Sequence, residues 1–231
     1  NIDNKYLLAL NYSIGNVLDV KLGLTFGILC KILFDSDSSY LKKALLDAKI
    51  ADEVVLDYNN GILQPVFSIV AKNAKKDKIE LFKETVISTF KKIINDGIDK
   101  DIIKSAINNF EFELKEADTG TYPKGLIYGI TIMESWLYDG NPTLLLEYED
   151  ALEQIKKEAE NGLFENVIKE FIVENDKYNF VILSPKENLS EINDKILKEK
   201  LGEFKKALND KELESLVEST KSLLKAQQTP D

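Results

Sequence analysis

The stretch FEFELKEADTGTYPKGLIYGITIMESWLYDG, residues 110–140, indicates the fold most directly. It starts as the end of one helix, breaks at residues 118–120, and restarts as a second helix that ends near Tyr138. Gly and Pro interrupt helices, and Thr121 is a candidate N-cap before Pro123. The second helix has apolar residues at three- and four-residue steps, which predict one apolar face: Ile127, Ile130, Met133, Trp136 and Leu137. We expect this helix pair to be the core scaffold, with Trp136 and Ile130 buried.

The composition narrows the classes of partner. The chain has 231 residues and a net charge of −10, and all 30 of its basic residues are Lys. Its length allows one large domain, or one domain with an appendage. Because there is no basic excess to neutralise phosphates, we expect no nucleic-acid partner and no binding to an anionic membrane surface.

The residue types also limit the chemistry. The sequence has no His and a single Cys, Cys30. This excludes Ser-His-Asp and Cys-His catalysis and every zinc site that needs imidazole, so we expect no catalytic residue and no metal ligand here. Cys30 lies in an apolar run and is interpreted as a small core residue. One Cys and no visible signal peptide favour a cytoplasmic location. Since the chain begins at Asn1 without Met, we expect it to be a piece of a longer protein.

The alternation of strand and helix patterns predicts an α+β fold. It consists of a mainly antiparallel sheet of about four strands, covered by helices on one face, followed by a C-terminal helical hairpin. Asp77 and Asp99 are the expected N-caps of two successive helices, and Gly97 is the expected stop between them. The strands are expected at residues 5–14, 53–58, 64–72 and 178–183, and the helices at 17–34, 39–48, 78–95, 99–117, 142–161 and 164–175.

The last part of the chain differs in composition. Residues 186–226 are rich in Lys and Glu, with apolar residues at helical spacing and a break at Asn209 and Asp210. We expect two antiparallel helices that bury one narrow seam, and a linker at residues 227–231. The domain boundaries are therefore predicted at 1–185 and 186–231.

Few side chains are candidates for a site. Glu111, Glu113 and Glu116 cluster before the helix break, but in such a charged sequence a solvated or salt-bridged role is the favoured interpretation. Tyr122, at the turn, is a candidate substrate contact if it stays accessible. Lys124 is a candidate substrate anchor, and the alternative is an ordinary surface lysine in a first helical turn.

Five segments, taken in order, carry a resemblance to a known family: residues 10–34, 38–50, 62–70, 110–152 and 223–231. The most specific is residues 113–142, where ELKE, TYPKG, WLYDG and NP recur together. The sequence resembles the middle, peptidase-associated segment of insulinase (pitrilysin)-type zinc metallopeptidases, in the presequence-protease and falcilysin branch.

The resemblance implies four homologous α+β domains in two halves of a clamshell, which enclose a chamber where oligopeptides are cleaved. Zinc would be bound outside this segment, by an inverted His-x-x-Glu-His motif that is absent here. The segment is then expected to be noncatalytic, forming chamber wall and connector between the halves, with the remaining domains and an oligopeptide substrate as partners. Two alternatives are a stand-alone peptide-binding or scaffold module without proteolysis, and an enzyme using Lys and carboxylate chemistry. The second has no supporting geometry in the sequence.

Overall fold

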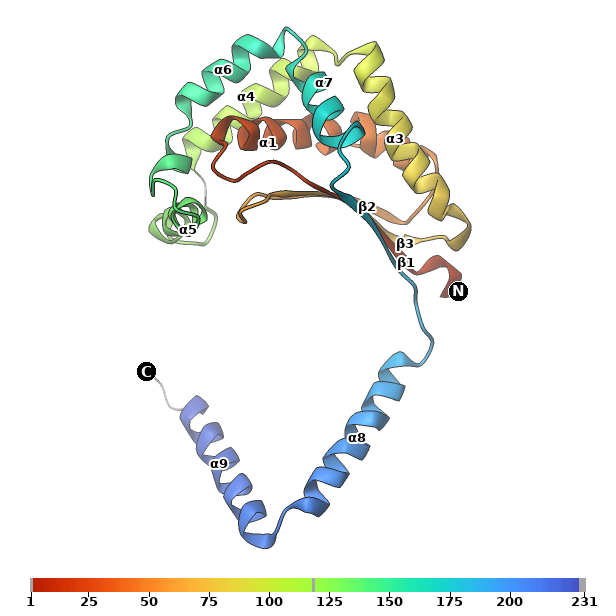
Figure 1. Ribbon diagram of the computed structural model, residues 1–231, viewed down its shortest axis with the longest axis vertical. Helices are drawn as coiled ribbons and strands as arrows, with labels where there is room; N and C mark the ends of the chain where they lie inside the picture. Colours follow the sequence, from red (N-terminus) through yellow and green to blue (C-terminus); the bar gives the residue numbers. More distant parts are fainter. Residues whose placement is uncertain (1, 118, 229–231) are drawn as a thin grey trace. The chain divides into compact units, whose positions relative to one another are not determined.

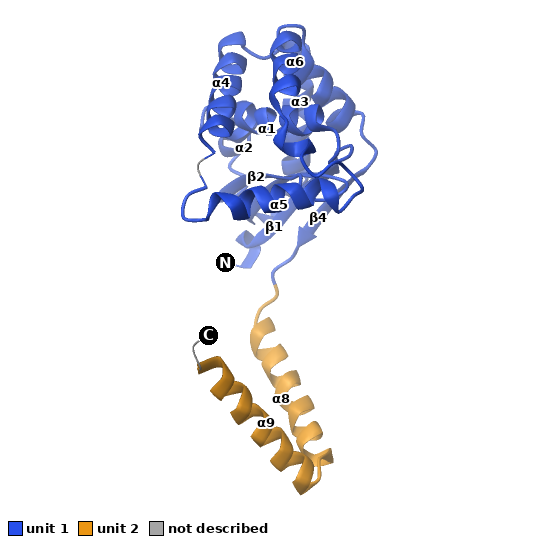
Figure 2. Cartoon of the chain, turned by 90° about the vertical axis from the view of Figure 1, so that its left-hand side faces the viewer, with its two compact units in different colours: residues 1–185 blue, residues 186–231 orange. Residues whose placement is uncertain are grey.

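The computed structural model describes residues 2–117 and 119–228, which form two compact units, residues 1–185 and 186–231 (Figure 2). Each unit is described by itself. Asp118, in the expected helix break, and residues 229–231 of the expected linker lie outside the described residues. No helix in the described part of the chain is both long and apolar enough to cross a membrane.

Unit 1 is built on one antiparallel sheet of four strands, in the order β2-β3-β1-β4. Along β1, Leu8, Leu10 and Tyr12 are buried on one face, as the alternating pattern requires. The sheet and its helical cover confirm the predicted α+β fold. The strands are β1 (Tyr6–Ser13), β2 (Glu53–Asn59), β3 (Val66–Ala74) and β4 (Tyr178–Leu183).

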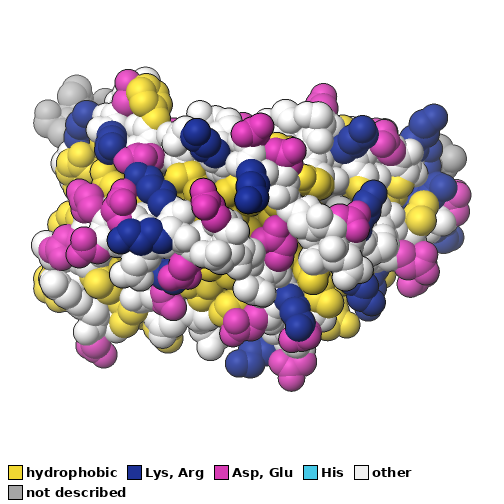
Figure 3. All heavy atoms as spheres, turned by 90° about the horizontal axis from the view of Figure 1, so that it is seen from above, with side chains coloured by type: hydrophobic (Ala, Val, Ile, Leu, Met, Phe, Trp, Pro, Cys, Tyr) yellow, Lys and Arg dark blue, Asp and Glu magenta, His cyan; other side chains and the backbone are white. Residues whose placement is uncertain are grey.

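The helices of unit 1 gather over one face of this sheet (Figure 1). Seen from above, their outer surface carries interspersed Lys and Asp/Glu side chains, without a large patch of one sign (Figure 3). The helices are α1 (Val20–Phe34), α2 (Tyr40–Asp47), α3 (Ile79–Asp96), α4 (Lys100–Glu116), α5 (Lys124–Trp136), α6 (Glu149–Ala159) and α7 (Leu163–Ile168), with 3-10 turns at Ile2–Asn4, Lys76–Lys78 and Leu144–Leu146 (η3) and a π segment at Lys169–Val173.

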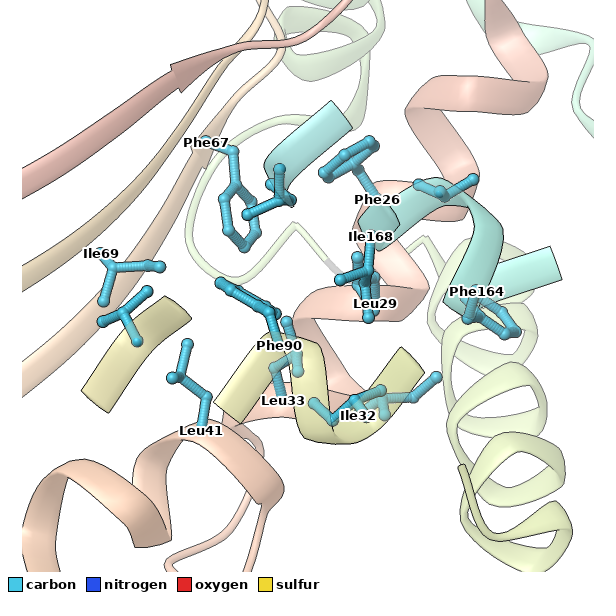
Figure 4. Packing of buried hydrophobic residues seen from close by; sticks show 14 of the residues in the cluster. Phe26, Leu29, Ile32, Leu33, Leu41, Phe67, Ile69, Phe90, Phe164 and Ile168 are labelled. Carbon is cyan, nitrogen blue, oxygen red and sulfur yellow. The ribbon is translucent and has the colours of Figure 1, made fainter. Parts of the chain in front are cut away.

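The core lies between the sheet and α1, α2, α3 and α7 (Figure 4). Phe26 of α1 is fully buried, and its ring centroid lies 5.5 Å from that of Phe67 on β3. At the β4 edge of the same face, Phe180 of β4 stacks on Phe82 of α3, with ring centroids 6.0 Å apart. Aromatic pairs at these separations add to the hydrophobic stabilisation of burial.

Two helix boundaries follow the sequence signals. Asp99 accepts a hydrogen bond from the Asp101 amide at 2.8 Å and so caps α4, as expected. Gly97 ends α3 with a φ of 77°, a conformation that favours glycine. Both signals depend only on residues a few positions away, which is why the sequence reveals them.

Three boundary predictions were wrong. Asp77 lies in the 3-10 turn before α3 and does not cap it. Thr121 does not cap α5, whose N-cap is Pro123, because a turn between Thr119 and Tyr122 precedes the helix. The expected helix 142–161 is replaced by η3 followed by α6, which begins at Glu149.

Unit 2 consists of α8 (Leu189–Ala207) and α9 (Asp210–Gln228), joined by a two-residue turn at Leu208 and Asn209. Asn209 accepts a hydrogen bond from the Glu212 amide at 3.0 Å, and the Glu212 side chain accepts one from the Asn209 amide at 2.9 Å. This reciprocal pair starts α9 as a capping box does. Within residues 189–228 neither helix has a buried residue. The prediction of a buried seam between the two helices was therefore wrong.

Candidate functional site

Tyr122 and Lys124 lie at the start of α5, and both are exposed. The Tyr122 side chain is 63% exposed, and its backbone carbonyl accepts a hydrogen bond from the Thr119 hydroxyl at 2.7 Å. Lys124 Nζ donates a long hydrogen bond, 3.4 Å, to the carbonyl of Glu116 at the end of α4. Both side chains are thus accessible, although neither lines a cavity among those described. The roles of Tyr122 and Lys124 as substrate contacts stay predictions.

Helix α5 itself turns an apolar face outward. Its exposed residues are spaced by four, three and four positions, so they lie in one stripe along the helix. The stripe consists of Leu126 (51% exposed), Ile130 (49%), Met133 (41%) and Leu137 (64%). Trp136, which is 60% exposed, lies beside it. The prediction that Trp136 and Ile130 are buried was therefore wrong, because the expected apolar face points away from the core.

The attachment of α5 explains this exposure. Its one buried residue among those described is Ser135, whose hydroxyl donates to the Asn141 carbonyl at 2.9 Å. Its main neighbour is η3, and a Cβ at Gly140 would lie 2.5 Å from Leu18 Cδ2, so the chain is tightly packed just after the helix. Figures 1 and 2 place α5 at the level of the sheet, apart from the other helices. A helix that is apolar on most sides is normally buried on most sides, so α5 has the surface of a helix with a second partner.

The second open surface of unit 1 is the face of the sheet opposite the helices. A polar row crosses all four strands there, and the Asn11 side-chain amide donates to Asn179 Oδ1 at 2.9 Å. By strand register the polar row is Asp57, Ser68, Asn11 and Asn179, and the adjoining apolar row is Val55, Val70, Ala9 and Val181. Within unit 1, the described helices leave this face uncovered (Figure 1).

The predicted carboxylate cluster is a set of ion pairs. Glu111 contacts Lys115 at 2.6 Å and Lys156 at 3.0 Å, and these lysines lower the pKa of its carboxyl group. Glu113 pairs with Lys31 at 2.7 Å. Glu116 is exposed. Glu111 and Glu113 therefore tie α4 to α1 and α6, and the salt-bridged interpretation of these two residues is confirmed.

The chain does not fit a zinc site of its own. It has no His, and burial, with a smaller contribution from Asp57, raises the pKa of its single thiol, Cys30, to about 12. Cys30 packs half-buried against the core. Among the described residues, no group of three or more Cys, Asp or Glu side chains is placed to hold a metal ion. A zinc ion needs several such donors at once.

Known proteins match the whole chain. It is 40% identical to Protein HypA of Clostridium perfringens over 231 residues, and 28% identical to presequence protease 1 of Arabidopsis thaliana over 240 aligned residues. Both alignments cover 100% of this chain but only 24% and 22% of the relative, so the chain spans about a quarter of their length. The chain is an insulinase-type segment of the presequence-protease branch, without the zinc motif. No protein-family model matches the sequence.

Solved structures agree with the fold of this insulinase-type segment. The inactive peptidase domain of a zinc protease from Bordetella parapertussis superposes with a TM-score of 0.64 at 15% identity, over 80% of this chain and 95% of that one. At this identity the likeness concerns the fold alone. The same fold therefore occurs in a domain that is described as inactive.

The composition of α5 contains a signal for its outward face that the spacing of apolar residues does not reveal. Leu126 and Tyr128, both exposed, are not among the five residues of the predicted apolar face, and they extend the apolar surface around the helix. Between Lys124 and Trp136, Glu134 is the only further charged residue. A helix with so little polar surface indicates two contact faces, of which unit 1 supplies one.

Proposed function

We propose that the chain is a noncatalytic segment of a zinc-dependent metalloendopeptidase that degrades oligopeptides. Unit 1 forms part of the wall of the reaction chamber, and unit 2 connects the two halves of the enzyme. The observation that carries the proposal is the alignment with presequence protease 1 of Arabidopsis thaliana. It covers all of this chain, which corresponds to about a quarter of the relative's length.

The surfaces of the segment support this role. The outer stripe of α5 and the open face of the sheet are apolar or mixed surfaces of the kind that domains bury against each other or against a ligand. In unit 2, large apolar side chains such as Ile196, Leu201 and Phe204 are about half exposed, at 45%, 56% and 56%. Contacts with other domains of the parent would cover them.

The chemistry of the parent lies outside this segment. The zinc ion would be bound by another domain, where it would activate water for peptide hydrolysis. The role of this chain is mechanical: its walls exclude bulk water and hold the peptide, and Tyr122 and Lys124 are its proposed substrate contacts. Movement of a connector such as unit 2 would open and close the chamber. A cytoplasmic location for the parent belongs to the same proposal.

Peptide cleavage by the purified chain tests the proposal. We expect no cleavage of a mixture of oligopeptides, with or without added zinc, because the sequence has no His and, among the described residues, no three acidic or thiol side chains are placed to hold a metal ion. A full-length parent with an upstream His-x-x-Glu-His motif should cleave the same mixture, and lose activity when the Glu of that motif is replaced by Gln. Cleavage that follows residues 1–231 through purification and disappears on substitution within them would overturn the proposal.

A stand-alone peptide-binding or scaffold module is the second candidate. The exposed stripe of α5 and the open sheet face favour it as well, because both would serve a binding protein. The two candidates differ in the complete gene. A full reading frame without a His-x-x-Glu-His motif, whose product binds oligopeptides without cleaving them, would favour the module.

A further inference from the structure

A cavity of about 430 Å³ lies between α5 and the rest of unit 1. Its walls come from five places in the sequence: α1 and the residues just before it, the end of β2 with the turn that follows, α4, α5 and η3. Apolar side chains make up much of the lining, among them Val20, Leu24, Phe110 and Leu145. A cavity of this size and composition is in the range of small-ligand sites.

Two carboxylates line this cavity, Asp19 and Glu134. Asp19 uses Oδ1 to cap α1, accepting from the Leu22 amide at 2.9 Å. The Glu134 carboxylate reaches across to the β2–β3 turn, where a Cβ on Gly61 would lie 3.1 Å from Oε1. Burial raises the pKa of the Glu134 carboxyl group, and within the described residues it has no hydrogen bond or ion pair.

A third polar group is the hydroxyl of Tyr58, also in the lining. It is buried without a hydrogen-bond partner. Burial, with smaller contributions from Cys30 and Asp19, raises the pKa of Tyr58, so the group stays a neutral donor or acceptor. No Lys is found among the described residues that line the cavity. The cavity lining therefore has two carboxyl groups and no basic side chain.

The lining decides which kind of cation fits. A divalent metal ion takes about six oxygen ligands, and no group of three acidic or thiol side chains meets among the described residues. An aliphatic stem, in contrast, fits against Val20, Leu24 and Leu145 while its charged end meets the carboxylates. Lys and Arg side chains have this form. The chain contains no Arg, so an arginine here would come from another molecule.

We propose that this cavity is a binding site for a basic side chain, Arg or Lys, of a peptide substrate, with Glu134 and Asp19 as its charge partners. The inference rests on the proposed function for the source of the side chain, since it takes the bound chain to be the oligopeptide that the parent degrades. It adds a substrate feature to that function: a preference for peptides with a basic residue at one position.

Binding of three capped peptides to the chain tests this site. The peptides are acetyl-Ala-Arg-Ala-amide, the same peptide with Lys, and the same peptide with citrulline, a neutral analogue of Arg with almost the same shape. We expect the Arg and Lys peptides to bind at least about tenfold more tightly than the citrulline peptide, in NMR titrations at low salt.

Matched variants locate the effect. Glu134→Gln should abolish the preference for the basic peptides, and Asp19→Asn, which keeps an acceptor for the helix cap, should reduce it. Glu84→Gln removes an exposed carboxylate from α3 and should leave the preference unchanged. Circular dichroism shows whether each variant is folded. Because Glu134→Gln and Asp19→Asn change different elements, one variant still tests the site if the other does not fold.

Two outcomes would overturn the inference: equal affinity for the Arg and citrulline peptides, or a preference that survives Glu134→Gln. The experiment is separate from the test of the proposed function. A parent without peptidase activity would refute the function but leave a demonstrated basic-side-chain site, whereas a chain that does not distinguish the peptides refutes the site even if the parent is a peptidase.

Discussion

Helices α1 and α5 are similar in apolar composition but differ in their surroundings. Both are predominantly apolar, VKLGLTFGILCKILF against KGLIYGITIMESW. In α1, six described residues are buried, whereas in α5 only Ser135 is buried. The comparison shows that an apolar helix sequence predicts that a surface will be covered, but not which part of the protein covers it.

The neighbours of α1 account for the difference. On one side, Phe26 packs on Phe67 and lies 5.5 Å from the ring of Tyr58. On the other side, Gly27 lies under the ring of Phe110, so close that a Cβ there would be 2.7 Å from Cζ. Helix α1 is therefore enclosed between the sheet and α4. Helix α5 has a neighbour on one side only, and the cavity beside Glu134 separates it further from the core.

The largest expected effect is in amide hydrogen exchange. Amides in the buried part of α1 should exchange only on global unfolding, which typically costs about 5–15 kcal/mol, whereas amides of α8 and α9 should exchange by local opening at a cost near zero. Exchange in unit 2 should thus be more than about a thousandfold faster, with α5 between the two. NMR or mass spectrometry measures this. Equal protection of α8 and α1 would mean that unit 2 has a buried core of its own.

The next effect is the loss of a core side chain from α1. Phe26→Ala should lower the free energy of unfolding by about 3–5 kcal/mol, because it removes a fully buried ring and leaves a cavity. Urea denaturation measures the change, and the conservative Phe26→Leu variant is the control, with a smaller loss. A loss below about 1 kcal/mol for Phe26→Ala would show that the contacts of α1 in Figure 4 are not those that stabilise the chain.

The smallest effect should come from the matching change in α5. Trp136→Ala should alter the free energy of unfolding by less than about 1 kcal/mol, because the side chain is 60% exposed in the isolated chain. The same denaturation experiment, repeated at several protein concentrations, checks this. A loss of 3 kcal/mol or more, on the order of the core substitutions, would mean that the outer face of α5 is covered. A dependence on concentration would then identify a second copy as the cover.

Much of the fold could be predicted because its signals are local. The short apolar run of residues 178–183 indicated β4, Gly97 and Asp99 marked the boundary between α3 and α4, and the break at Asn209 separated α8 from α9. Each of these depends on hydrogen bonds or side-chain spacing within a few residues. Asp77 and Thr121 failed as caps because the chain turns before the helix begins, and that turn has no comparable signal.

By itself, the sequence determined the α+β order of elements, the likeness to insulinase-type segments, and the lack of imidazole chemistry, since these depend on composition and local pattern. Only the tertiary structure decided that the apolar stripe of α5 faces outward and that Asp19, Tyr58 and Glu134 line one cavity. The reason is physical. A helical period states which residues share a face, but burial depends on contacts between elements far apart in the chain, and these arise only when the sheet and its helices pack together.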